Sequence, residues 1–218
     1  MFVRRFSTPD TPALYDVCLR TADAGDDASH LHNEPSLIGH VWLGPYLALE
    51  PELAWVVDDG TGRSLGYIVG ALDTLEFERA RERSWWPDLR ALYPQNVHRG
   101  ATTDADEALV RTIHHPHPPR LDVVETHPSH LHIDLLPEAQ GAGFGRALID
   151  TLCAALTGRG STGVHVVVAA VNTRALGFYR NVSFVDLTAT ADAVWLGRGL
   201  AGGSRGPAPT ATNRHPRR

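Results

Sequence analysis

Three alternate glycines lie in the stretch Gln140-Gly141-Ala142-Gly143-Phe144-Gly145-Arg146. Glycine lets a backbone turn tightly and leaves its N–H groups accessible. The residues that follow have the apolar period of a helix, and the partial positive charge at a helix N-terminus attracts anions. The sequence therefore predicts a site for a phosphate group at this turn.

Two common phosphate-binding motifs are excluded. A dinucleotide-binding G-x-G-x-x-G would need glycine at position 146, where this chain has arginine. A Walker loop needs a lysine, and the 20 basic residues are all arginine. The lack of lysine also excludes a Schiff base or a lysine general base.

Further groups with possible chemistry precede the glycines. If residues 130–136 form a strand, alternation places His130, His132 and Asp134 on one face and Leu131, Ile133 and Leu135 on the other. A carboxylate or an imidazole on such a face could accept a proton, whereas a solvated sheet residue would do no chemistry. Both alternatives remain open at this point.

The elements around these residues predict a βαβ unit. His130–Leu136 is the first strand, and Phe144, Leu148, Leu152 and Leu156 recur every four residues on the helix that follows. The apolar run Val164–Val171 predicts a second strand, buried on both faces. Such a unit crosses over right-handed, and the fold class is α/β.

The other elements flank this unit. Ahead of it we predict, in order, a strand Phe2–Phe6, a helix from Thr11, a helical region Pro35–Leu49, a strand pair Ala54–Val57 and Leu65–Leu72, a helical segment Leu75–Pro94 and an irregular stretch 95–128. After it we predict a helix Thr173–Asn181 and closing strands Phe184–Leu187 and Ala193–Leu196.

The amino-acid composition limits the classes of protein to which this chain can belong. The 218 residues are 43% hydrophobic with a net charge of −5, typical of one soluble domain and unlike a nucleic-acid-binding protein. We expect no membrane span and no signal peptide. The two cysteines, Cys18 and Cys153, are expected to be buried in a protein of the reducing cytoplasm. Residues 198–218 hold five arginines and no acid, so the rest carries −10, and 201–218 are expected to form a basic, disordered tail.

The glycine stretch resembles the phosphate loop of the GCN5-related N-acetyltransferases, Q/R-x-x-G-x-G/A, at Gln140, Gly143 and Gly145. A second motif of that family, an Asn followed by a helix with Ala and an aromatic-Tyr pair, is matched by Asn172, Ala175 and Phe178-Tyr179. Phe184 fits the family's closing Gly-Phe. Ser183 replaces that glycine, a departure that concerns the turn and not the chemistry.

The resemblance extends to one branch, the acetyltransferase-like domain of O-GlcNAc hydrolases and its free-standing bacterial relatives. Segments such as Leu37-Ile38-Gly39 and Gly44-Pro45-Tyr46-Leu47 carry it, and it spans residues 2 to about 200. It implies one domain, 1–200, with the acetyltransferase fold: a mixed sheet of about six to seven strands flanked by helices, with a helical insertion 75–128 between the third and fourth strands. Sugar hydrolysis is not implied.

The family implies acetyl-CoA as the cofactor. Backbone N–H groups of the glycine loop would hold its pyrophosphate, main-chain groups of Leu135 and Leu136 its pantetheine and acetyl carbonyl, and Asn172 the pantetheine arm. The residues expected at the cofactor are Leu135, Leu136, Gln140, Gly141, Ala142, Gly143, Phe144, Gly145, Arg146, Asn172, Ala175 and Phe178.

The same resemblance implies the catalytic groups. Tyr179 would donate a proton to the departing CoA thiolate, unless it only packs. Asp134 is expected to be the general base, with His132 as the alternative. The expected reaction is direct transfer of acetyl to a primary amine, the acceptor being a small cationic amine, an amino sugar or a basic peptide. The alternative is a non-catalytic acetyl-CoA-binding or protein-interaction module.

Two clusters are expected to have no such role. His114-His115-Pro116-His117 and His127 match no usual ligand spacing, so we predict no metal there. Trp85-Trp86 either walls an acceptor groove or fills the core, and core filling is the preferred interpretation.

Overall fold

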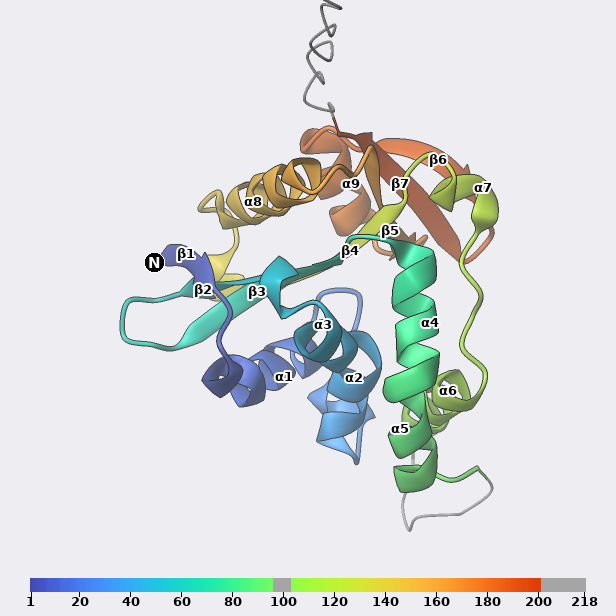
Figure 1. The fold of residues 1–218 in the computed structure, drawn as a ribbon. Helices are drawn as coiled ribbons and strands as arrows, with labels where there is room; N and C mark the ends of the chain where they lie inside the picture. The colour runs from blue at the N-terminus through green and yellow to red at the C-terminus, as the bar shows by residue number, and fades with distance from the viewer. Residues whose placement is uncertain (96–102, 201–218) are drawn as a thin grey trace, which may run out of the picture.

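The computed structural model describes residues 1–95 and 103–200, in which seven strands form one mixed sheet in the order β1-β2-β3-β4-β5-β7-β6 (Figure 1). The strands are β1 Phe2–Arg5, β2 Ala54–Asp58, β3 Ser64–Ala71, β4 Ser129–Leu135, β5 Gly163–Ala169, β6 Val185–Ala189 and β7 Ala193–Gly199. The predicted mixed sheet of six to seven strands is confirmed. The predicted tail, 201–218, lies outside the described residues.

Helices cover both faces of the sheet. They are α1 Thr11–Leu19, α2 Pro35–Trp42, α3 Gly44–Leu49, α4 Thr74–Ser84, α5 Trp86–Leu92, α6 Asp104–His114, α7 Leu121–Val124, α8 Phe144–Gly158 and α9 Thr173–Asn181. In Figure 1, α8 and α9 lie above the sheet, whereas α1, α2 and α3 lie below it. The single helical region predicted for 35–49 is two helices, because Pro45 in the first turn of α3 has no N–H with which to continue α2.

The predicted βαβ unit is β4, α8 and the parallel strand β5. Leu148, Leu152 and Leu156 are fully buried along α8, as the four-residue period predicts. On the sheet, a Cβ added to Gly70 of β3 would lie 2.8 Å from Leu152. Helix α8 therefore packs directly on the β3 backbone.

Strands β4 and β5 separate after a short contact. They pair only at Ser129↔Val164 and His130↔His165. Beyond that point β4 stays paired with β3 as far as Leu135, and β5 stays paired with β7 as far as Ala169. Because each strand follows its own antiparallel neighbour, the sheet divides into two wings with a gap between β4 and β5.

This separation corrects one prediction about β5. The apolar run 164–171 was expected to be buried on both faces, but Val167 is 51% exposed and β5 ends at Ala169. Val167 lines the space that opens where β4 leaves β5, so its side chain stays exposed. Here the departure of β4 uncovers one side of β5.

The insertion between β3 and β4 consists of α4, α5, α6 and α7. The prediction of an irregular stretch at 95–128 is wrong where α6 and α7 lie. Thr103 caps α6 by accepting a hydrogen bond from the Asp106 N–H, and Leu109 and Ile113 bury its apolar face. The proline and histidine residues after residue 114 favoured a prediction of irregular structure, so this helix was not predicted. Residues 96–102 lie outside the described part.

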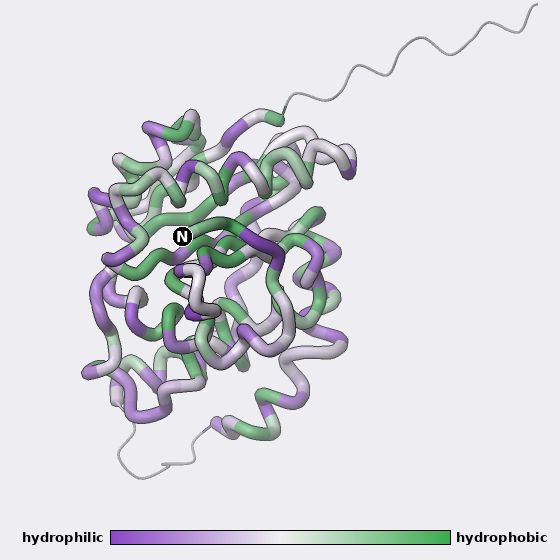
Figure 2. Tube along the Cα trace, turned by 90° about the vertical axis from the view of Figure 1, so that its left-hand side faces the viewer, coloured by the Kyte–Doolittle hydropathy of each residue, from purple (hydrophilic) through white to green (hydrophobic). Residues whose placement is uncertain are grey.

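Hydropathy follows this layering. Figure 2 shows hydrophobic residues concentrated along the central strands, with hydrophilic segments mostly at the periphery. Cys18 and Cys153 are buried and unpaired, as predicted. Within 1–95 and 103–200, no helix has both the length and the apolar character needed to cross a bilayer.

Candidate functional site

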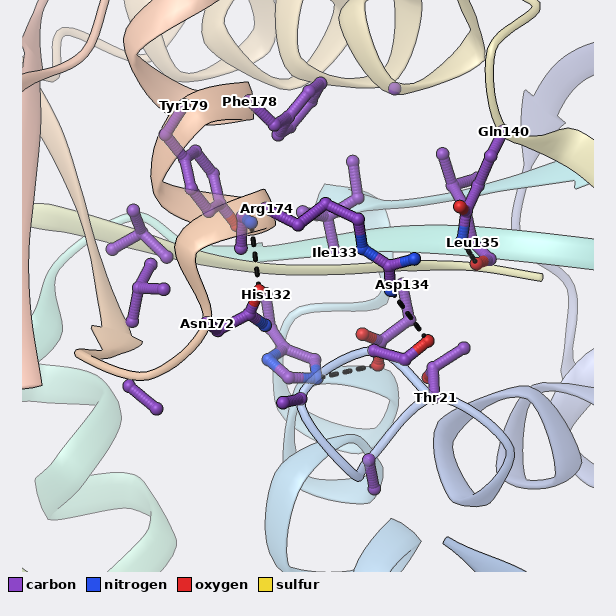
Figure 3. A pocket seen from close by; sticks show the side chains of 18 of the residues that line it. Thr21, His132, Ile133, Asp134, Leu135, Gln140, Asn172, Arg174, Phe178 and Tyr179 are labelled. Carbon is purple, nitrogen blue, oxygen red and sulfur yellow. Dashed lines mark hydrogen bonds and ion pairs between the residues drawn. The ribbon is translucent and has the colours of Figure 1, made fainter. Parts of the chain in front are cut away.

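A cavity of about 630 Å³ opens where β4 and β5 part. Its walls come from four places: the β4 segment Ile133 to Leu135, the β5 segment Val166 to Ala169, the glycine loop with the start of α8, and α9 (Figure 3). The end of α1, the loop after it and α2 close the far side. The cavity therefore joins the two predicted motifs, which lie about thirty residues apart in the chain.

The β4 main chain offers hydrogen-bonding groups to this cavity. The Leu136 N–H bonds Leu65 O at 2.9 Å, with Leu135 opposite Gly66 in the ladder. Because antiparallel ladders alternate, the N–H and C=O of Leu135 and Ile133 point away from β3, toward the space that β5 has left. The Leu135 carbonyl accepts a hydrogen bond from Gln140 Nε2 at 2.8 Å. An extended ligand could pair with these groups as an added strand would.

The glycine loop has the backbone that the sequence predicts. Gly141 and Gly143 have φ of 72° and 85°, and Gly143 is the N-cap of α8. A Cβ at either would meet nothing within 4 Å, so the left-handed conformation alone requires glycine there. At Gly145 a Cβ would lie 2.9 Å from the Phe178 ring. Gly145 therefore lets α8 approach α9.

The loop also presents its surface to the cavity. Gln140, Gly141, Gly143, Gly145 and Arg146 line it, at the N-terminus of the 15-residue helix α8. Arg146 Nη2 donates to Asn181 O at 2.7 Å and so ties α8 to α9. Open backbone at a helix N-terminus suits a phosphate or pyrophosphate.

Three residues predicted at the cofactor lie outside the cavity lining: Leu136, Ala142 and Phe144. Leu136 is buried, its N–H bonds Leu65 O and its carbonyl accepts from the Ala139 N–H. Leu136 was expected to offer main-chain groups to the cofactor. In the structure Ile133, which was not predicted, has the free main-chain groups instead. The binding roles of Ala142 and Phe144 stay predictions.

The second motif forms the α9 wall. Asn172 Oδ1 accepts from the Ala175 N–H at 2.9 Å, which makes Asn172 the N-cap of α9. Asn172, Ala175 and Phe178 all line the cavity. After the helix, Ser183 has φ of 69°, the left-handed conformation that a glycine would adopt without strain. The serine at position 183, in place of the glycine of the family motif, therefore affects the turn, as predicted.

Tyr179 projects from α9 toward β4 (Figure 3). It lines the cavity although it is only 5% exposed, and its ring is held edge-on between Phe178 and Phe184. Burial, and then the negative charge of Asp134, raise the pKa of Tyr179 well above its ordinary value. The phenol therefore keeps its proton near neutral pH.

His132 and Asp134 form a pair on the opposite wall. His132 Nε2 lies 3.0 Å from Asp134 Oδ2, and the Tyr67 hydroxyl donates to the same oxygen at 2.5 Å. Burial lowers the pKa of His132, but the charge and hydrogen bond of Asp134 outweigh it and raise that pKa to about 10. His132 is thus an imidazolium near neutral pH.

The predicted alternation on β4 holds, but His130 has a different environment. Its ring contacts those of Tyr46 and Phe77, and its Nδ1 lies 2.8 Å from Thr74 Oγ1. Burial strongly lowers its pKa. His130 is therefore a neutral core histidine.

The tryptophan pair belongs to the core. Trp86 is fully buried, and Trp85 Nε1 donates to His40 O at 2.9 Å. The tryptophan that lines the cavity is Trp42, at the end of α2 and 43% exposed. No period or motif in the sequence distinguishes it from other helix-end residues.

Other cavity residues were also missed by the sequence analysis. Arg174 Nη2 donates to Gly25 O at 3.0 Å, which joins α9 to the loop after α1. Tyr67, also not predicted, lies outside the cavity lining but reaches Asp134 through the β3–β4 register. The predicted absence of a metal at the histidine cluster stays a prediction: His114 Nε2 lies 2.8 Å from Tyr93 O, and His115 Nε2 lies 2.9 Å from Gln95 Nε2.

Comparison with known proteins identifies the family. The model of the acetyltransferase (GNAT) family matches residues 26–184. The chain belongs to this family. The crystal structure of SsHAT is similar at 38% sequence identity and a TM-score of 0.85, over 92% of this chain and 98% of that one. The family resemblance and the fold predicted from sequence are both confirmed.

More distant structures share the fold. One is a phosphinothricin acetyltransferase from Sinorhizobium meliloti, in complex with AcCoA, at 14% identity and a TM-score of 0.54 over 96% of this chain and 94% of that one. Another is Naa20 from Chaetomium thermophilum, in complex with a bisubstrate analogue, at 20% identity and a TM-score of 0.51 over 92% and 87%. The placement in the O-GlcNAc hydrolase branch stays a prediction.

Proposed function

We propose that this GNAT protein transfers the acetyl group of acetyl-CoA directly to a primary amine. The observation that carries the proposal is the gap between β4 and β5. There, the main-chain groups of Ile133 and Leu135 that point away from β3, the glycine loop and the protonated Tyr179 face one cavity. The S. meliloti relative, whose structure holds AcCoA, supports this choice of cofactor.

The residues present fit acetyl-CoA. The open backbone at Gly141 and Gly143, before α8, suits its pyrophosphate. The main-chain N–H and C=O groups of Ile133 and Leu135 can form hydrogen bonds with the amides of its pantetheine arm, as a strand edge does with an added strand. The β5 side is apolar, with Val166, Val167 and Val168. When bound, acetyl-CoA supplies the acetyl group as a thioester.

Tyr179 is proposed as the general acid. A thiolate that departs inside a largely apolar cavity is poorly solvated and becomes more basic, for the same reason that burial raises the pKa of Tyr179. A phenol that keeps its proton at neutral pH can supply that proton as the thiolate leaves. Phe178 and Phe184 hold the ring in place.

Asp134 is proposed as the proton acceptor for the attacking amine. His132 and the Tyr67 hydroxyl both contact Oδ2. Oδ1 is therefore the oxygen that would take up the proton of the attacking amine. The geometry favours Asp134 over His132, because Nε2 of His132 already contacts the carboxylate. His132 and Tyr67 then position the carboxylate.

The acceptor is proposed to be a cationic amine, amino sugar or basic peptide. The chain outside residues 198–218 carries a charge of −10, which attracts cations over the distance of a Debye length. Attack requires the amine to lose its proton, and Asp134 lies where that proton can be taken up.

An acceptor-panel assay tests this proposal. Release of the free CoA thiol is measured with polyamines, amino sugars and arginine- or lysine-rich peptides, for wild type, Asp134→Asn and a no-enzyme control. We expect wild type to exceed the control on at least one amine. Asp134→Asn should lower kcat about 10²-fold or more while acetyl-CoA binding, followed by calorimetry, is retained.

Two results would count against the proposal. Binding of acetyl-CoA without thiol release on every amine would favour the non-catalytic module. Equal rates for wild type and Asp134→Asn would remove Asp134 from the mechanism.

A further inference from the structure

The structure brings a cysteine to the His132–Asp134 pair. Cys18, the penultimate residue of α1, lines the same cavity and is 2% exposed. One ligand atom each of Cys18, His132 and Asp134 lie within 4.8 Å of one another. We propose that these three side chains form a binding site for Zn²⁺ or a similar borderline-soft cation such as Co²⁺.

The spacing suits a tetrahedral ion. Zn²⁺ holds sulfur at about 2.3 Å and nitrogen or oxygen at about 2.0–2.2 Å, so neighbouring ligand atoms are about 3.3–3.6 Å apart. The His132 Nε2 to Asp134 Oδ2 separation of 3.0 Å needs a few tenths of an ångström of opening. The remaining separations, at most 4.8 Å, need closure of about 1 Å, which rotamer adjustment can supply.

The chemistry of the three donors selects the kind of cation. On binding a cation, the Cys18 thiol and the His132 imidazolium each release a proton. The resulting thiolate and imidazole, with the Asp134 carboxylate, suit Zn²⁺ and Co²⁺, whereas Mg²⁺ and Ca²⁺ require oxygen ligands alone. The Tyr67 hydroxyl donates a hydrogen bond to Asp134 Oδ2 and would orient that ligand. Three protein ligands leave a fourth position, and the cavity lies beside them.

Such an ion would regulate the site. It would occupy the carboxylate proposed as the proton acceptor, so Zn²⁺ would inhibit acetyl transfer reversibly. Metal binding itself does not depend on the proposed function, because it needs neither acetyl-CoA nor an amine. The two proposals can therefore fail separately.

Cobalt titration tests the site on the resting protein. Chelator-treated full-length chain is titrated with Co²⁺, and the near-ultraviolet thiolate-to-Co²⁺ charge-transfer absorbance is recorded. The chain has only two cysteines, so Cys153→Ser, which alters the other buried thiol, is the matched control. Mg²⁺ is titrated in parallel, and Zn²⁺ is then used to displace Co²⁺.

We expect one saturable Co²⁺ site with the thiolate band in wild type and in Cys153→Ser. Cys18→Ser should lose the band, and His132→Gln should bind more than about 100-fold more weakly, a loss beyond that of an outer-shell partner. Cys18→Ala and circular dichroism provide the same test should Cys18→Ser misfold. Absence of the band in wild type, or its persistence in Cys18→Ser, would overturn the proposal.

Discussion

At the residue scale, one carboxylate organises the candidate site. Asp134 Oδ2 is contacted by the Tyr67 hydroxyl and by His132 Nε2, and its charge contributes to the raised pKa of Tyr179 across the cavity. A carboxylate that is largely removed from water needs such partners, because desolvation without hydrogen bonds costs several kcal/mol. The acid and base groups of the proposed reaction are therefore electrostatically linked.

Substitution of Tyr179 by phenylalanine removes the proton donor and keeps the ring. We expect Tyr179→Phe to lower kcat about 10²-fold or more, with the acetyl-CoA Kd changed less than about threefold, because the hydroxyl acts on the leaving group. Tyr46→Phe is the control, since Tyr46 is also buried but stacks on Phe77 outside the cavity lining. Unchanged kcat in Tyr179→Phe would leave Tyr179 as a packing residue.

At the element scale, the site depends on how helices α8 and α9 pack beside strands β4 and β5, which separate from each other there. Helix α8 must approach α9 closely enough for the glycine loop and Tyr179 to face one cavity. Gly145 permits this approach, since a Cβ there would lie 2.9 Å from Phe178 and 3.4 Å from Leu135. The close contact transmits any change at Gly145 to both walls.

Gly145→Ala tests this contact. Overpacking should lower the free energy of unfolding by about 1–3 kcal/mol and weaken acetyl-CoA binding. Gly177→Ala on α9 is the control, because a Cβ there meets nothing within 4 Å, and alanine in a helix is favoured over glycine by about 0.5–1 kcal/mol. Thermal or urea unfolding and calorimetry measure both quantities. Equal affinity in the two variants would contradict the role given to Gly145.

Elements with strong local signals were predictable from sequence. Helix α9 was predicted with its bounds, Thr173–Asn181, because Asn172 caps it, and α8 because its leucines recur every four residues. Helix α6 was missed because Pro and His follow it. The exposure of Val167 follows from the separation of β4 and β5, a tertiary feature that the apolar run 164–171 does not encode.

At the scale of the whole molecule, the site is assembled from residues far apart in the chain. The sequence indicated the glycine loop, Asp134 and Tyr179, because family motifs mark them. It could not indicate Tyr67, whose contact with Asp134 depends on the register of β3. Nor could it indicate Cys18 and Trp42, whose approach to the cavity depends on the packing of α1 and α2. Contacts that arise only from tertiary packing leave no pattern in the local sequence.

The insertion is joined to this body through Asp106 of α6. Asp106 is 1% exposed and accepts from the Asn33 N–H at 2.9 Å, with His32 Nδ1 at 2.8 Å. Burial raises the pKa of Asp106, but the hydrogen bonds from His32, Asn33 and Thr103 outweigh it, and the net pKa is lowered. The insertion is therefore attached by a buried carboxylate.

The depressed pKa gives a pH dependence. Stability from Asp106 is present above the unfolded value of about 3.9 and is lost as pH falls through the lower folded value. We expect Asp106→Asn to lower the free energy of unfolding at pH 7 by about 1.5–3 kcal/mol and to flatten the dependence below about pH 4. Asp88→Asn, at an exposed acid on α5, is the control. Urea unfolding as a function of pH measures both, and identical curves for Asp106→Asn and wild type would contradict this assignment.

The central claim is that the gap between β4 and β5 holds acetyl-CoA. Calorimetric titration of the wild-type chain with acetyl-CoA tests it most directly, with thermal unfolding as a second readout. The account predicts one saturable site per chain and a rise in Tm with acetyl-CoA concentration. The absence of both binding heat and a thermal shift would contradict it.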